Sequence, residues 1–226
     1  MKFLRMVESM TDGWWLKDRL KPHYMKVVQA FKFHVENKRF KKEGEGVLHK
    51  ASKALTNAGV FHWLEFGTLL GVIRDGKLIA HDTDLDFGVW LEDSNDAIPN
   101  AMEAAGFTKV HRIEIDEGAY GLEESYEFNG VKVDLFFFTK TNTGMYCHLF
   151  PVVAKRKRAV REVFTSVNEF KSISWQAMAV HIPKNPDQRL KDTYGDYWVP
   201  QKKWNTPNQA LNSRLISKQY TEKKSW

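Results

Sequence analysis

The sequence has almost no cysteine, no long apolar run and no signal-peptide pattern. Its 226 residues include one cysteine, Cys147, so an intramolecular disulfide is excluded, and this usage fits a reducing compartment. No apolar run approaches the roughly 20 residues that a membrane-spanning helix needs. The N-terminal segment MKFLRMVESMTDGWW lacks the continuous apolar stretch of a signal peptide. We therefore expect a cytoplasmic protein without a membrane span.

Apolar residues are nevertheless plentiful enough for a sizeable core. Hydrophobic residues make up 42% of the chain and aromatic residues 13%. The formal net charge of +6 suits polyanionic ligands such as nucleotides, sugar phosphates or nucleic acid. Many plain soluble proteins carry a similar excess, so the charge alone excludes little.

Hydrophobic spacing predicts helices at both ends of the chain. Residues 14–33 form one expected helix, packed on the domain, and residues 47–58 form a second. The polar segment 40–46, which contains Gly44 and Gly46, is the expected loop between them. Further helices are expected over 94–106, 190–194 and 209–218, followed by a flexible tail.

Strands are expected between these helices, over residues 60–66, 81–90, 107–115, 120–128 and 131–138. Asn129-Gly130 predicts a two-residue hairpin turn before the last of them. The first strand ends at Gly67-Thr68 and leads into a short helix. A strand, a small-residue turn and a helix N-terminus form an arrangement that suits phosphate binding, because backbone N–H groups point at the anion.

The stretch HDTDLDFGVW, residues 81–90, carries the strongest chemical signal. Successive side chains of a strand alternate between its faces, so Asp84 and Asp86 would share one face. Adjacent carboxylates repel each other unless a cation or a shared proton offsets their charge. Asp134 is a single acid in the apolar run VKVDLFFF and also needs a partner. Together these acids predict a magnesium-type site for chemistry at phosphorus.

Simpler explanations exist for each of these residues. Asp84 and Asp86 could lie on an exposed strand face, Asp134 could pair with Lys132, and Arg74 could be a surface arginine. Cys147-His148 lacks a second pair at zinc-site spacing and favours ordinary packing. A basic run such as Lys155 to Arg161 is most often a solvent-exposed face. The functional alternatives are contacts with donor phosphates, with a polyanionic acceptor or with nucleic acid. Five aromatics are candidates for stacking a sugar or base, although most are expected in the core: Trp175, Tyr194, Tyr197, Trp198 and Trp204.

A Gly-Thr pair, an Asp-x-Asp strand and a later strand with one Asp resemble the nucleotidyltransferase fold shared with DNA polymerase β. More narrowly, WLEFGTLLGVIRDGKLIAHDTDLDFGV resembles the signature of the LicD/fukutin-type phosphotransferases, and IPKNPDQRLKDTYGDYWVP is similar to the closing element of that family. The matching positions are Trp63, Gly67, Thr68, Leu69, Leu70, Gly71, Arg74, Asp75, Gly76, Asp82, Asp84, Asp86, Pro183, Leu190, Tyr194, Gly195 and Trp198.

The resemblance implies an α/β (α+β) fold, with a nucleotidyltransferase-type mixed β-sheet and flanking helices. The expected organisation is an N-terminal helical segment packed on the core over 1–58, a catalytic domain over 59–200, and a C-terminal helix and tail over 201–226. Its implied reaction moves a phosphorylated alcohol, of the choline, ribitol or glycerol phosphate type, from a CDP-activated donor to a sugar hydroxyl of a glycan, releasing CMP.

The resemblance also implies a role for each site residue. Asp84, Asp86 and Asp134 would hold Mg²⁺ or Mn²⁺, with Asp134 also a candidate general base. Other positions would bind substrate: Gly67 and Thr68 against donor phosphates, Arg74 as a neutralising cation, and Asp82 with a less defined role. His81 and Thr83 depart from the family pattern, so His81 could line a different substrate pocket.

Two alternatives remain open at the level of sequence. One is nucleotidyl transfer from an NTP to a small hydroxylated acceptor or nucleic acid. The other is a catalytically inactive module that binds a nucleotide or a glycan. The presence of all three acids argues against the inactive module, because such a copy would be free to lose one of them.

Overall fold

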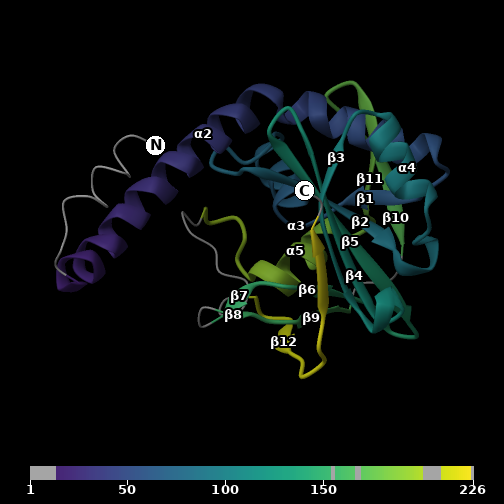
Figure 1. Cartoon of the computed structure of the whole chain (residues 1–226). Helices are drawn as coiled ribbons and strands as arrows, with labels where there is room; N and C mark the ends of the chain where they lie inside the picture. Colours follow the sequence, from purple (N-terminus) through teal and green to yellow (C-terminus); the bar gives the residue numbers. More distant parts are fainter. Residues whose placement is uncertain (1–13, 154–155, 166–168, 201–209, 225–226) are drawn as a thin grey trace.

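A curled mixed β-sheet forms the centre of the molecule (Figure 1). The computed structural model describes residues 14–153, 156–165, 169–200 and 210–224, with the backbone alone for 14–23, 25 and 153. Seven strands of the nine-stranded sheet follow the order β12-β9-β6-β5-β4-β3-β13, while β2 bonds to β5 and β1 bonds to β2. Two further pairs, β10-β11 and β7-β8, form small separate sheets.

The described helices and helical turns are α2 (Trp14–Asn57), α3 (Phe66–Leu70), η1 (Gly71–Asp75), η2 (Leu91–Asp93), α4 (Ala97–Ala104), η3 (Asp116–Gly118) and α5 (Pro186–Tyr194). The strands are β1 (His62–Leu64), β2 (Asp84–Trp90), β3 (Thr108–Ile115), β4 (Gly121–Phe128), β5 (Val131–Thr141), β6 (Gly144–Leu149), β7 (Val152–Val153), β8 (Arg156–Lys157), β9 (Val160–Phe164), β10 (Phe170–Trp175), β11 (Met178–Pro183), β12 (Ser213–Leu215) and β13 (Thr221–Lys224).

Strand alternation divides the two faces of the sheet. Leu85 and Phe87 of β2, with Val133 and Leu135 of β5, are fully buried in the core beneath α2 and α4. The alternate residues of the same strands face the other side, where an aromatic cluster that includes Trp63, Phe136 and Phe138 lies. The acids at positions 84, 86 and 134 therefore belong to the face opposite the long helix.

The N-terminal helix differs from the prediction. Instead of two helices and a loop over 40–46, α2 is one helix of 44 residues. Phe40, Val47, Leu48 and Leu55 bury a continuous face of it in the core, and this packing outweighs the low helix propensity of two glycines. Gly44 is itself useful there, because a Cβ would lie 3.1 Å from Leu78 Cδ1. The expected packing of residues 14–33 is also not seen for 26–34, whose side chains are exposed.

The C-terminal helix predicted over 209–218 is wrong for the residues described. β12 pairs with β9, and β13 pairs with β3 through residues expected to form a flexible tail. Both are edge strands whose side chains are mostly exposed, so they are held mainly by backbone hydrogen bonds to their neighbours. For this reason their sequences show little apolar alternation.

The fold class is α+β, as predicted, and the Asn129-Gly130 turn joins β4 to β5 as expected. Both turn residues have positive φ, 52° and 74°, which is the conformation that such a two-residue turn requires. None of the helices in the described part of the chain is long and apolar enough to cross a membrane.

Candidate active site

The three acids predicted to act together are brought together by strand pairing. β2 and β5 run parallel, and their register places Asp86 directly opposite Asp134. Asp84 lies two residues earlier on the same face of β2, opposite Lys132. The alternative in which Asp134 pairs with Lys132 is not seen, because no ion pair joins them among the described residues and Asp134 Oδ1 is buried without a hydrogen-bond partner.

Burial and crowding disfavour the charged form of these acids. Burial, followed by repulsion from Asp84, raises the pKa of Asp134 to about 7. The same two causes raise the pKa of Asp82 to about 8. Burial and the negative charges of the three neighbouring aspartates hold the pKa of Asp86 well above its usual range. The site therefore concentrates negative charge that a cation would offset.

A short turn after β1 holds Asp86 in place. The N–H groups of Gly67 and Thr68 donate to Asp86 Oδ2 at 2.9 and 3.4 Å, and the backbone N–H of Asp86 donates to Thr68 Oγ1 at 2.8 Å. A side chain at position 67 would not fit, because its Cβ would lie 2.8 Å from Asp82 Oδ2. Gly67 and Thr68 thus position the carboxylate of Asp86, and their direct contact with a phosphate stays a prediction.

The backbone of this turn is strained at Phe66, whose φ of 43° is unusual for a residue with a Cβ. A buried ion pair fixes the turn. Arg189 of α5 donates from Nε and Nη2 to the two carboxylate oxygens of Glu65 at 3.0 and 2.6 Å, and both side chains are almost fully buried. Glu65 also accepts bonds from Trp63 Nε1 at 2.7 Å and from the Phe66 N–H at 3.3 Å.

Neither Glu65 nor Arg189 was predicted as a site residue. They lie 124 positions apart, and the one available signal was that Glu65 is a single acid in the apolar run 60–66, which does not identify its partner. The ring of Trp63 shows a related constraint, since a Cβ on Gly88 of the neighbouring strand would lie 2.1 Å from its Cε2. The motif residues Trp63 and Gly88 therefore pack closely against each other beneath the turn, and the buried Glu65–Arg189 pair fixes the turn itself.

A cavity of about 430 Å³ opens over the acids. Of the eight predicted site residues, six line it, and two, Thr68 and Asp134, do not. Arg74 is largely buried there, with its guanidinium bound to Asp75 at 2.8 and 2.9 Å, so it is not a free surface arginine. The lining consists of Phe66, Gly67, Leu70, Arg74, Ile79, His81, Asp82, Asp84, Asp86, Phe136, Leu149, Thr193, Tyr194, Tyr197 and Val199.

The aromatic lining was predicted only in part. Tyr194 and Tyr197, two of the five candidate stacking residues, do line the cavity. Trp175 is buried in the core, Trp198 is 54% exposed, and Trp204 lies outside the described residues. Phe136 was missed, although its position two residues after Asp134 on the same strand face could have indicated it.

Other charged and polar candidates lie away from this cavity. The described part of the basic run contributes no lining residue: Lys157 pairs with Glu222 at 2.9 Å, and Arg161 stacks on Tyr120 and Tyr146. Lys155 lies outside the described residues. His148 is buried beside Cys147, and burial lowers its pKa to about 4, which fits the expected packing role.

The donor set suits a hard divalent cation. Carboxylate oxygens are the ligands that Mg²⁺ prefers, and the buried Asp134 Oδ1 has no other partner. Within the described ranges, no three His, Cys, Asp or Glu side chains are already arranged as a complete metal site. Asp86 binds the turn through Oδ2, and cation binding by Asp84, Asp86 and Asp134 stays a prediction.

Stability should respond to pH and to divalent cations together. Asp82 and Asp134 have folded-state pKa values of about 8 and about 7, above the usual value near 3.9 of an unfolded chain. The folded state therefore binds protons more tightly, and this stability is present below about pH 4 and is lost as pH rises toward 8. Thermal melting with and without Mn²⁺ should show cation stabilisation that is small at about pH 5.5 and grows through pH 7 and 8.

An Asp134→Asn variant supplies the control for that measurement, because it removes one of the competing carboxylates. Its melting temperature should respond weakly to Mn²⁺ at every pH. Equal stabilisation of both proteins, or stabilisation of the original chain that does not change with pH, would contradict proton–cation competition at these acids.

The family model described as LicD/FKTN/FKRP, nucleotidyltransferase domain, matches residues 59–185, which include the turn and all the acids of the site. The ribitol-5-phosphate transferases FKTN of Macaca fascicularis and Homo sapiens are each 30% identical to the chain over 175 residues, covering 75% of this chain and 36% of the relative. The ribitol 5-phosphate transferase FKRP of Homo sapiens is 34% identical over 95 residues, covering 39% of this chain and 19% of the relative.

The chain thus spans about a third of the length of the FKTN relatives it matches. The family match begins just before β1 and ends at the start of α5, so it contains the strand pair that carries the acids. The resemblance seen in the sequence motifs is confirmed: the chain belongs to the LicD/FKTN/FKRP family.

Proposed function

We propose that the chain is a metal-dependent phosphotransferase. It would move a phosphorylated alcohol from a CDP-activated donor to a sugar hydroxyl of a glycan and release CMP. The observation that carries this proposal is the group of half-buried carboxylates formed by Asp84, Asp86 and Asp134, of which Asp84 and Asp86 line the cavity. Support comes from the relatives, whose names describe ribitol phosphate transfer.

The acids and the arginine would share the work of binding a diphosphate. Asp84, Asp86 and Asp134 would hold Mg²⁺ or Mn²⁺, which supplies charge neutralisation for phosphoryl chemistry when bound. The Gly67–Thr68 turn keeps one oxygen of Asp86 fixed, which leaves its second oxygen for the ion. Arg74 lines the same cavity with its Nη1 directed to the Tyr197 carbonyl at 3.4 Å, and it would neutralise a donor phosphate.

The acceptor hydroxyl needs a base that reaches the cavity. Asp82 lines the cavity, whereas Asp134 is not among its lining residues, so the lining favours Asp82 over Asp134 for this role. His81 lies on the exposed rim of the cavity and would contact the donor alcohol or the acceptor.

A ligand screen by thermal shift tests the reaction class. CDP-ribitol, CDP-glycerol and CDP-choline are compared with CTP and ATP, each with and without Mn²⁺. Ligand at about 100 times its Kd stabilises by about 2.7 kcal/mol, which corresponds to a rise of about 5–10 °C for a chain of this size. We expect this rise for at least one CDP-alcohol, only with the cation present.

The Asp84→Asn variant, which lacks one cation ligand, serves as the control and should show no such rise. A similar shift with CTP and ATP would favour nucleotidyl transfer from an NTP, the second reaction that the name of the family domain allows. No shift with any nucleotide would contradict both.

A further inference from the structure

The N-terminal part of α2 projects from the body of the molecule (Figure 1). Every side chain from 26 to 34 is exposed, and two large apolar ones are exposed by more than two thirds: Val27 by 68% and Phe31 by 69%. Farther along the same helix, Phe40 is 3% exposed in the core. A single helix therefore carries both a core-forming segment and an apolar segment that no described residue covers.

Three of the exposed apolar side chains, Val27, Val28 and Phe31, lie on the face of α2 opposite the core, whereas Phe33, 48% exposed, falls on the line of Phe40. Phe31 and Phe40 are nine positions apart, about two and a half helical turns, so they point in opposite directions. Tyr24, Val27 and Val28 fall at helical spacing with Phe31 and form one stripe. Folding this helix onto its own domain would leave the stripe outward, so the stripe needs a different binding surface.

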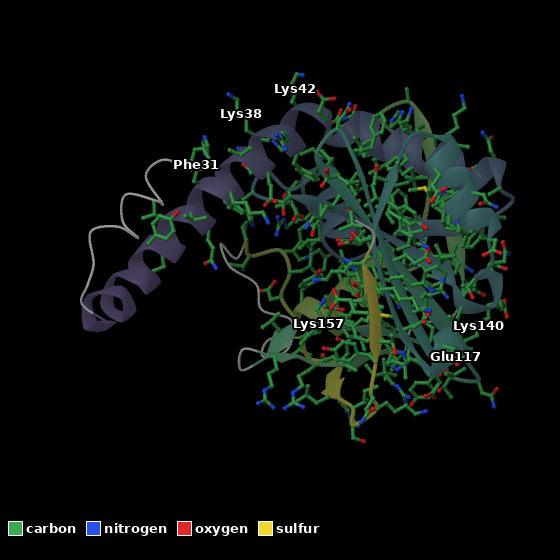
Figure 2. The ribbon with its side chains drawn as sticks, viewed as in Figure 1. Phe31, Lys38, Lys42, Glu117, Lys140 and Lys157 are labelled. Carbon is green, nitrogen blue, oxygen red and sulfur yellow. The ribbon has the colours of Figure 1, made fainter. Side chains whose placement is uncertain are left out.

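Positive charge accompanies the stripe. Between residues 26 and 45 the helix has three acids, Glu36, Glu43 and Glu45, and six basic residues, of which Lys42 pairs with Glu43 at 2.7 Å: Lys26, Lys32, Lys38, Arg39, Lys41 and Lys42. Lys38 and Lys42 follow Phe31 by seven and eleven positions, which places them on the same line along the helix. Figure 2 shows Phe31, Lys38 and Lys42 along one outer edge of α2. Apolar side chains and cations thus share one outward face.

We propose that this face of α2 binds an anionic membrane surface. The helix would lie in the plane of the surface, with Val27, Val28 and Phe31 in the headgroup region and Lys38 and Lys42 against anionic headgroups. Basic helices with one apolar stripe bind membranes in this way. A second copy of the chain would meet this face with the same positive charge, so it is a weaker fit. A different protein is also a weaker fit, because protein interfaces are depleted in lysine.

The exposed segment of α2 joins the domain beside the loop at the edge of the cavity. Asn37 lies where the helix joins the domain, and its side-chain amide donates to the carbonyls of Ala80 and Asp82 at 3.0 and 2.8 Å. The helix is therefore tied to the loop that carries His81 and Asp82 at the cavity rim. This binding does not depend on which reaction the cavity catalyses.

Co-sedimentation of the full chain with vesicles tests the proposal. Vesicles of phosphatidylcholine alone are compared with vesicles that contain about 30 mol% phosphatidylserine. We expect the chain to pellet only with the anionic vesicles at about 0.1 M salt, and to be released at about 1 M salt. The double variant Lys38→Ala/Lys42→Ala should bind about 25-fold more weakly, from about five-fold for each lysine. Val27→Ser/Phe31→Ser should also lose binding.

The matched control is Lys140→Ala/Lys184→Ala, which removes the same charge from exposed positions outside α2 and should bind as the original chain does. All of these substitutions are at exposed side chains, so unchanged thermal melting shows that the variants fold. Equal pelleting with both vesicle types, or unchanged binding of the α2 variants, would overturn the proposal. So would a dimer, detected by sedimentation velocity without vesicles, that is lost in Val27→Ser/Phe31→Ser.

Discussion

Asp84→Asn is expected to abolish metal-dependent transfer and to leave the fold intact. Asp84 lines the cavity and supplies negative charge that raises the pKa of both Asp82 and Asp134. An asparagine of the same size keeps the packing but removes the charge that a cation and a diphosphate need. We expect activity to fall on the order of 10³-fold, the upper end for loss of one electrostatic contact at a reacting group.

For the same substitution we expect activity to fall but stability to be kept or increased. Without metal, Asp84→Asn removes repulsion among crowded carboxylates, so the free energy of unfolding at about pH 8 should stay the same or rise. Turnover assays with Mn²⁺ and urea unfolding without metal give the two measurements. Asp96→Asn is the matched control, because Asp96 is exposed and its side chain caps no helix, so both quantities should stay unchanged. Retained turnover in Asp84→Asn would refute the metal assignment.

Arg189→Met should strongly lower the free energy of unfolding, because Arg189 forms the buried ion pair that fixes the turn of the site. Arg189 is 1% exposed, binds both oxygens of Glu65, and stacks with its guanidinium carbon 3.4 Å from the centre of the Phe164 ring. Removing it leaves the Glu65 carboxylate buried without its cation. Loss of one partner of a buried pair costs about 3–5 kcal/mol of the free energy of unfolding, measured here by urea unfolding.

A second substitution separates the charge effect from lost packing. Adding Glu65→Gln removes the stranded charge, so the double variant should be more stable than Arg189→Met alone. Lys191→Met on the same helix is the control: its exposed pair with Asp187 should contribute less than about 1 kcal/mol. A loss in Arg189→Met as small as this control, or a double variant less stable than the single one, would contradict a stabilising role for the pair.

The fold was predictable wherever local pattern and tertiary packing agree. The alternation around Asp84 and Asp134 gave two strands with the acids on one face, and their parallel register confirms that arrangement. The glycines at 44 and 46 suggested a loop, but the apolar residues beyond them bury one helical face and keep α2 continuous. The strands near the C-terminus carry few buried side chains, and for that reason no sequence pattern indicated them.

The acids of the site were predictable from the sequence, whereas the residues that hold them in place were less so. Asp82, Asp84, Asp86, Arg74, His81 and Gly67 meet at one cavity, as a shared function requires. The Gly67–Thr68 turn suggested a phosphate cradle, whereas its N–H groups hold Asp86 in the structure. The role of Glu65 and Arg189 depends on a contact between distant residues, which no local window of sequence contains.

The parallel pairing of β2 with β5 has a consequence for how the molecule folds. β3, β4, β5 and β6 follow one another as antiparallel neighbours, so their contacts are local and close small loops. The pairing of β2 with β5 closes a longer loop, because β3 and β4 lie between them in the sequence, and the contact of Glu65 with Arg189 closes a loop of 124 positions. We therefore expect the antiparallel strands to form early, and the acids and the Glu65–Arg189 pair to come together late in the folding reaction.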